Sequence, residues 1–273
     1  MPDIKFKKKD LKRLLDFPVP FEMDLPWGEY EFSRRFYDIV NFWGIPTEKE
    51  IAFLKSFIKL KDWRLLDLAC GGGRHSLGLA AEGYKITAID IGRYPVEYAR
   101  EKARQDNLEV EFIVSDIREM KYDAEYNLAF LICGQMGHFS PEESLKIFGN
   151  VSRALVDDGI FIMHLPSFKK EDMTNTTHWY QEKKPFYFQN PSIVHREQYY
   201  FAEERIKLIR DFAIDQVTRQ NHLFGISEKH YLSAEIEKIA DESGMRIIGK
   251  YGDYEKAPMT SRSPENIYVL TRN

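Results

Sequence analysis

The feature that most constrains the fold is an alternation of short apolar runs with helical patterns between residues 64 and 165. Five runs have the length of a single strand, and helical patterns separate most of them; the runs lie at 64–69, 85–90, 110–114, 126–132 and 159–165. Runs that are apolar throughout are typical of parallel strands covered by helices on both faces. The sequence therefore predicts an α/β fold with a doubly wound, mostly parallel sheet.

Elements outside this region extend the sheet and interrupt it. Helical spacing predicts helices at 29–42 and from Pro46 onwards, and a helix at 233–243 precedes two further strands at 245–251 and 266–271, which gives seven strands. Between about residues 167 and 230 the alternation of strands and helices stops. Two β-like runs at 193–201 and 205–214 predict an antiparallel hairpin, with a third strand left open, inserted after strand 5. In the second run, one face is mostly apolar; it carries Ile206, Leu208, Arg210, Phe212 and Ile214.

Charge and composition exclude several classes of protein. The 273 residues include 39 basic and 43 acidic side chains, a net charge of −4, whereas nucleic-acid-binding domains are usually basic. We expect no nucleic acid partner and, without a run of about 18 apolar residues, no membrane partner. Two cysteines are too few for a disulfide framework, which favours reduced thiols and a cytoplasmic protein. A homodimer is left open.

A strand that leads into a glycine loop and a helix carries the first chemical signal. In DLACGGGRHS, Gly71 and Gly73 permit a backbone that a ligand can approach closely. Asp67 lies inside the strand, where a carboxylate would repel a pyrophosphate, and Ser76 stands where a dinucleotide fingerprint needs a third glycine or alanine. Opposite charges 4 Å apart attract by about 4 kcal/mol at an effective dielectric of 20. The loop therefore favours a cationic ligand over a dinucleotide.

Two further acids stand at the ends of the next strands. Asp90 ends the second strand, where a carboxylate can accept from ribose hydroxyls, and Asp116 follows the third, where it can accept from an adenine amino group. Each acid alone is more often a helix cap or a solvated side chain. Three acids at one sheet edge, around one glycine loop, predict a nucleoside site.

Four motifs in order, DLACGGGRHS, AID, SDIRE and ALVDDGIFIMHLPS, resemble those of class I S-adenosylmethionine (AdoMet)-dependent methyltransferases over residues 67–165. The resemblance implies a Rossmann-like methyltransferase fold. It also implies that Asp67 and the loop glycines hold the methionine part of AdoMet, Asp90 the ribose, and Asp116 with Ile117 the adenine. The full set assigned to cofactor binding is Tyr37, Asp67, Ala69, Gly71, Gly73, Arg74, Asp90, Ile91, Ser115, Asp116, Ile117 and Cys133.

The sequence after the fourth strand indicates the kind of acceptor. It lacks the Asn/Asp-Pro-Pro-Tyr signature of many nucleic-acid and protein N-methyltransferases, and its Gly137-His138 ending resembles small-molecule enzymes, including aminosugar N-methyltransferases. Tyr37-Asp38 resembles the Tyr-Asp pair that those enzymes place over the cofactor. We assign His138 and Tyr37 as the catalytic candidates, with His138 either orienting the nucleophile or taking its proton. A structural role for His138 stays open.

The inserted region is the candidate binding region for the methyl acceptor. Its polar and aromatic side chains assigned to substrate binding are His195, Arg196, Tyr199, Arg210, Arg219 and His222. One or two of the arginines would meet an acidic group of the substrate; the alternative is that most are solvated or form cross-strand pairs. No histidines stand at the spacing of metal ligands, so we expect no metal.

These inferences divide the chain into four segments. Residues 1–62 are N-terminal helices that cover the cofactor site, 63–166 the AdoMet-binding core, 167–230 the substrate-side insertion, and 231–273 the C-terminal part of the sheet. The predicted function is methyl transfer from AdoMet to a nitrogen or oxygen atom of a small molecule. The alternatives are an RNA or protein methyltransferase or a catalytically inactive nucleoside-binding protein on the same fold, and, last, a dehydrogenase.

Overall fold

The computed structural model describes residues 47–183 and 190–273. The predicted helix at 29–42, and with it Tyr37, lies outside the described residues. The chain forms two compact units, of which one contains Lys170–Lys229 and the other contains the described residues up to Lys169 together with His230–Asn273. Each unit has its own β-sheet.

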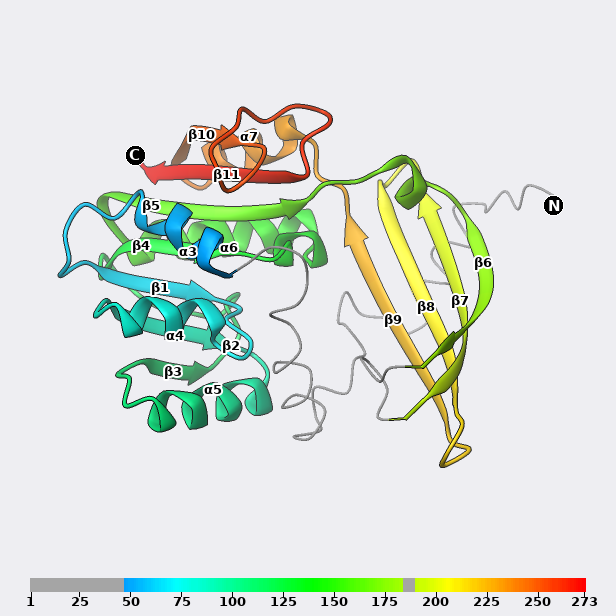
Figure 1. The fold of residues 1–273 in the computed structure, drawn as a ribbon. Helices are drawn as coiled ribbons and strands as arrows, with labels where there is room; N and C mark the ends of the chain where they lie inside the picture. The colour runs from blue at the N-terminus through cyan, green and yellow to red at the C-terminus, as the bar shows by residue number, and fades with distance from the viewer. Residues whose placement is uncertain (1–46, 184–189) are drawn as a thin grey trace. The chain divides into compact units, whose positions relative to one another are not determined.

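The larger unit is built on a seven-stranded sheet with the strand order β10-β11-β5-β4-β1-β2-β3 (Figure 1). Strands β1 to β5 run parallel to their neighbours among themselves, whereas β11 is antiparallel to both β5 and β10. The strands are β1 (Arg64–Leu68), β2 (Lys85–Asp90), β3 (Glu111–Val114), β4 (Tyr126–Leu131), β5 (Leu155–Pro166), β10 (Met245–Tyr251) and β11 (Glu265–Arg272). The predicted seven-stranded, mostly parallel sheet is confirmed.

Helices cover both faces of this sheet, and each face has its own hydrophobic core. One core lies against α6 (Pro141–Ala154) and α7 (Ser233–Glu242). The other lies against α3 (Thr47–Lys55), α4 (Arg74–Ala81) and α5 (Arg93–Gln105). Successive residues of β1 alternate between them, with Leu66 in the first core and Leu65 in the second. Double burial explains why the central strands read as unbroken apolar runs.

Helix α6 begins with a complete capping box, which fixes where its first turn lies. The Ser140 side chain accepts from the backbone N–H of Glu143, and the Glu143 carboxylate accepts from the backbone N–H of Ser140. Pro141 occupies the first turn, where its missing N–H costs no hydrogen bond. Among the residues described, no helix is long and apolar enough to cross a membrane.

The smaller unit is a four-stranded antiparallel sheet in the order β6-β7-β8-β9, not the two or three strands expected. The strands are β6 (Thr176–Glu182), β7 (Ser192–Phe201), β8 (Ile206–Asp215) and β9 (Asn221–Lys229). The predicted hairpin is β7 and β8. Strand β6 escaped prediction because it is a largely exposed edge strand, TTHWYQE, without an apolar alternation. The sheet is separate and follows β5, as predicted.

The face of this sheet that is buried changes along the length of its strands. On β8, Ile206 and Leu208 are buried, but Phe212 and Ile214 on the same face are 39% and 41% exposed. The residues buried at that end, Val194 and Ala213, belong to the opposite face. The mostly apolar face that the sequence predicted over residues 206–214 is therefore buried over only part of its length.

The aromatic pair Phe148–Phe161 tests the packing of α6 on β5. Both side chains are fully buried, with ring centroids 5.4 Å apart at 89°. We expect Phe148→Ala to lower the free energy of unfolding by about 3–5 kcal/mol, because it removes a large side chain and leaves a cavity. Urea unfolding followed by circular dichroism measures the change. As a control, Leu60→Ala at a position 61% exposed should shift it by no more than about 0.5 kcal/mol; equal effects would contradict this packing.

Candidate active site

The glycine loop between β1 and α4 makes a tight turn in which three residues have a left-handed backbone. Ala69, Gly71 and Gly73 all have positive φ, at 54°, 54° and 76°. A Cβ at Gly73 would lie 2.9 Å from the ring of Phe112, so both the conformation and the packing require glycine there. The loop closes when the Gly73 N–H donates to the Cys70 carbonyl, immediately before α4 begins.

Asp90, at the end of β2, is tied to this loop by both of its carboxylate oxygens. One accepts from the backbone N–H of Gly71 at 2.8 Å and the other from Gly92 at 2.7 Å. Burial raises the pKa of Asp90, and the two N–H donors oppose that rise. Each oxygen keeps a lone pair for a second donor, as two vicinal hydroxyls would supply. The next residue, Ile91, is 64% exposed and offers an apolar surface beside them.

Asp67 is the most deeply buried acid of the three at this edge, with 2% of its surface exposed. Its carboxylate accepts from the Ser76 hydroxyl at 2.5 Å. Burial raises its pKa to about 7; the Ser76 hydrogen bond and the charge of Arg74 oppose the rise, and the charge of Asp90 adds to it. A buried acid with so little compensation is stabilised as a carboxylate by a cation nearby. The residues present therefore fit a ligand that carries a positive charge and a ribose.

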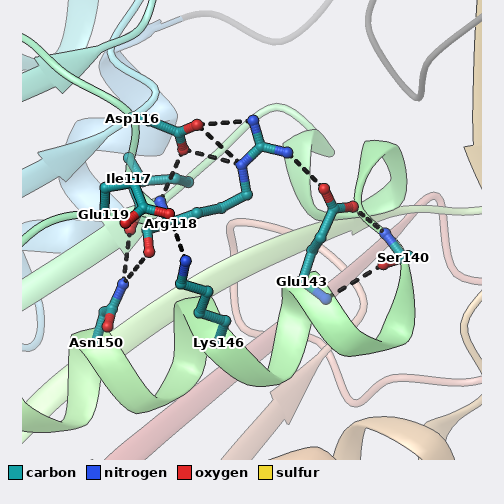
Figure 2. A network of polar contacts seen from close by, with 8 residues as sticks. All are labelled: Asp116, Ile117, Arg118, Glu119, Ser140, Glu143, Lys146 and Asn150. Carbon is teal, nitrogen blue, oxygen red and sulfur yellow. Dashed lines mark hydrogen bonds and ion pairs between the residues drawn. The ribbon is translucent and has the colours of Figure 1, made fainter.

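Asp116, after β3, already has a cationic partner. Figure 2 shows the Arg118 guanidinium on both oxygens of Asp116, with Nε at 3.0 Å from each. Burial alone would raise the pKa of Asp116, but the hydrogen bonds from Arg118 outweigh it and hold that pKa below its usual value. An adenine amino group would therefore share this carboxylate with Arg118, a residue that sequence reasoning missed.

The loop that carries Asp116 is fastened to helix α6. Arg118 donates to Glu143 of the capping box, and the Asn150 amide donates to the carbonyls of Ile117 and Arg118 (Figure 2). These contacts hold Ile117 at 5% exposure within the α6-side core. These contacts fix the backbone at 116–118. Packing in the core therefore also positions Ile117, which the sequence predicted as a cofactor-binding residue.

Arg74, the first residue of α4, joins three elements through a buried ion pair that sequence reasoning also missed. Its guanidinium donates to both oxygens of Glu50 on α3, to the Thr47 hydroxyl and to the Cys133 sulfur after β4. His75 contacts the same carboxylate through Nε2 at 2.9 Å. Burial would raise the pKa of Glu50, but His75 and Arg74 hold it below its usual value. An acid in the first turn of a short helix gave no signal of burial.

The segment after β4 carries the predicted catalytic histidine. Cys133 and Gly134 both have positive φ, and a 3₁₀ helix, Gln135–His138, follows. The strands β1 and β4 are neighbours, so Cys70 and Cys133 follow adjacent strands as expected. His138 lies at the end of the 3₁₀ helix and is partly buried; its catalytic role stays a prediction. Tyr37 lies outside the described residues, and Ser115 hydrogen-bonds through its N–H to the Asp90 carbonyl.

The residues predicted to bind substrate all lie in the smaller unit, on different faces of its sheet. By strand register, His195, Tyr199 and Arg210 share one face, whereas Arg196 and His222 share the other. Arg196 makes a double hydrogen bond to Asp211, and the His195 ring stacks on Trp179 with centroids 4.6 Å apart. Arg219 lies beyond β8 with an exposed side chain. The whole set therefore does not line one surface of the sheet.

Comparisons with known proteins identify the kind of domain that the chain resembles. Residues 65–159 match a family model described as a methyltransferase domain. A Bacillus subtilis (strain 168) protein named as a methyltransferase, YqeM, is 28% identical over 106 residues, which are 38% of this chain and 42% of that protein. The chain thus spans less than half of that relative. The cypemycin N-terminal methyltransferase of a Streptomyces species is 24% identical over 86% of this chain and 94% of its own.

Solved structures share the fold over most of the chain. An S-adenosylmethionine-dependent methyltransferase from Clostridium acetobutylicum ATCC 824 aligns with a TM-score of 0.72 at 19% identity, covering 87% of this chain and 96% of that one. The sugar N-methyltransferase KedS8 from Streptoalloteichus sp ATCC 53650 aligns at 0.64 and 12% identity, covering 87% and 92%. Residues 65–159 thus match a methyltransferase domain, as the motifs predicted, and the solved structures share its fold.

The raised pKa of Asp67 predicts a pH-dependent stability difference between the wild type and Asp67→Asn. Because the folded pKa of about 7 exceeds the ordinary 3.8, the folded protein holds this proton more tightly than the unfolded chain. The stability of the wild type relative to the variant should therefore fall as pH rises from about 4 to about 7 and then stay constant. Urea unfolding at several pH values measures it. A difference that rises with pH over this window would contradict the assignment.

Proposed function

We propose that the protein transfers a methyl group from AdoMet to a nitrogen or oxygen atom of a small molecule. The observation that carries this proposal is the pairing of a deeply buried acid, Asp67, with a ribose-type acceptor, Asp90, on two sides of one glycine loop. AdoMet combines a positively charged methionine part with a ribose in one molecule. A dinucleotide would instead place phosphate charge against Asp67.

In this proposal each acid has a different task. Asp67 and the backbone of the Ala69–Gly73 loop hold the methionine part, and Asp90 accepts from the two ribose hydroxyls while Gly71 and Gly92 keep it oriented. Ile91, Ile117 and Asp116 receive the adenine. AdoMet, when bound, would supply an electrophilic methyl group on a cationic sulfur, with S-adenosylhomocysteine as the leaving group. The residues of this chain bind and align, since such an in-line displacement depends chiefly on alignment.

His138 and Tyr37 remain the proposed residues on the acceptor side. His138 ends the 3₁₀ helix that comes after β4, the strand next to β1. An imidazole there suits either orientation of the nucleophile or removal of its proton. The name of KedS8, a sugar N-methyltransferase, supports a small-molecule acceptor.

A peptide acceptor is a second candidate, and one observation favours it. The relative whose aligned region covers 94% of its own length is named as an N-terminal methyltransferase of cypemycin. A small amine and a peptide N-terminus present the same nucleophile, an amino group. Methyl transfer assays with short peptides and with aminosugars, run side by side, separate the two.

Asp90→Ala tests the proposed function. Loss of charge-assisted hydrogen bonds worth roughly 2–3 kcal/mol should weaken AdoMet binding about 30- to 150-fold, measured by isothermal titration calorimetry. Asp106→Ala, which removes an exposed acid just after α5, is the matched control and should bind as the wild type does. Unchanged AdoMet affinity in Asp90→Ala would count against the proposed site. Failure of the wild type to bind AdoMet would contradict the proposed function.

A further inference from the structure

The ion pair between Arg74 and Glu50 lies directly beside the proposed cofactor loop. Arg74 begins α4 immediately after Gly73, the last residue of that loop. Glu50, in the first turn of α3, is only 3% exposed although it is an acid. The guanidinium donates to both carboxylate oxygens of Glu50, with Nη2 at 3.1 Å from Oε1. Two donors on two acceptors fix the orientation of both groups as well as their distance.

Two more contacts hold the guanidinium in place. Its Nη1 donates to the Thr47 hydroxyl at 3.0 Å, and its Nη2 donates to the Cys133 sulfur at 2.6 Å. Each of these nitrogens carries two N–H bonds, so the contacts to Thr47, Glu50 and Cys133 use all four of them. The positive charge of Arg74 therefore has a fixed position between α3, α4 and the segment after β4.

The side chains of this cluster carry no net charge together. Burial alone would raise the pKa of Glu50, but hydrogen bonds with His75 and Arg74 hold it below its usual value, so Glu50 is a carboxylate. Burial lowers the pKa of His75, so that imidazole is neutral at neutral pH. Burial raises the pKa of Cys133, which is therefore a thiol. One negative charge, on Glu50, balances one positive charge, on Arg74.

The charge of Arg74 acts on the proposed cofactor site. Burial raises the pKa of Asp67, and Arg74 is the cation that opposes this rise. Asp67 is the carboxylate that the proposed function places at the cationic methionine part of AdoMet. A fixed guanidinium that acts on Asp67 also repels a cationic ligand there, unless an acid beside the guanidinium cancels its charge. Glu50 is in the position to do so.

AdoMet and its product S-adenosylhomocysteine differ in one charge. The sulfur of AdoMet is a cationic sulfonium, whereas the sulfur of S-adenosylhomocysteine is a neutral thioether. Both molecules carry the same amino, carboxylate, ribose and adenine groups. A change in the charge of the site therefore acts differently on the two ligands. A change in the shape of the loop acts on both.

We propose that Glu50 is a positioning residue that gives the site its preference for cationic AdoMet over neutral S-adenosylhomocysteine. It acts through Arg74, because its carboxylate is buried and engaged with Arg74 and His75. By cancelling the charge of the guanidinium, it leaves Asp67 and Asp90 to set the electrostatic potential at the ligand. This inference rests on the proposed function and deepens it: a residue outside the glycine-loop motif selects substrate over product.

Calorimetric titration of AdoMet and of S-adenosylhomocysteine into the whole protein tests this role. At about pH 8, above the Asp67 pKa of about 7, Asp67 is mostly ionised, so changes in its protonation contribute little. Glu50→Gln keeps the size of the side chain but leaves the Arg74 charge unbalanced. We expect AdoMet to bind about tenfold more weakly, the repulsion of two unit charges about 12 Å apart at an effective dielectric of about 20, and S-adenosylhomocysteine to change by no more than about twofold.

Two further variants isolate the effect of charge. Glu48→Gln makes the same substitution at an exposed acid in the same turn of α3, and it should leave both affinities unchanged. The double variant Glu50→Gln with Arg74→Gln removes both charges. We expect its ratio of the two affinities to stay within about twofold of the wild-type ratio, even where both affinities fall, because the charge balance is kept. This variant has no unbalanced charge at the ion pair, so it decides the question if Glu50→Gln alone does not fold.

The ratio of the two affinities decides between the outcomes. An unchanged ratio in Glu50→Gln would overturn the inference, and so would an equal loss of both affinities, which is the result of a purely structural role. A shifted ratio in the double variant would overturn it as well, because charge would then not be the cause. Failure of the wild type to bind AdoMet would instead contradict the proposed function, and the wild-type titration shows this before any variant is compared.

Discussion

The constraint on which the site depends is the burial of the Asp67 carboxylate in a central strand. Removing a carboxylate from water is costly unless hydrogen bonds or an opposite charge replace the lost hydration. The Ser76 hydroxyl replaces part of it, and Asp90, tied to the same loop, adds repulsion. The chain thus keeps two acids close together beside the glycine loop. A cation at this position relieves both the desolvation and the repulsion.

The three strand-end acids look alike in the sequence but have different partners in the structure. Asp67 has one hydroxyl, Asp90 has two backbone N–H groups, and Asp116 has the Arg118 guanidinium. These partners order the acids by how much negative charge remains for a ligand. Asp67 suits a cation, Asp90 suits neutral donors such as hydroxyls, and Asp116 keeps the least for a new partner. The proposed division of AdoMet among the three acids follows this order.

The large sheet could be predicted because its strands are buried on both faces, so that runs such as LLDLA and YNLAFL differ clearly from their helical flanks. The glycine loop and Asp67 could be predicted because they are contiguous in the chain, and Asp90 and Asp116 because each stands at or just after the end of a predicted strand. The edge strand β6 could not, since one neighbour and an exposed face impose no apolar period. Phe212 and Ile214 show that a regular alternation does not reveal which part of a face is covered.

Contacts between residues that are far apart in the sequence could not be predicted, for a different reason. Glu50 lies 24 positions before Arg74 and Cys133 lies 59 positions after it, and each is ordinary in its local context. They meet because α3 packs against α4 and because β4 lies beside β1, which brings the segments after these two strands together. The glycine loop is marked by its motif, but the acid that balances the charge of the first residue of its helix comes from another element. The motif therefore indicates the ligand, whereas only the packing of the elements around the loop shows how the charges beside it are balanced.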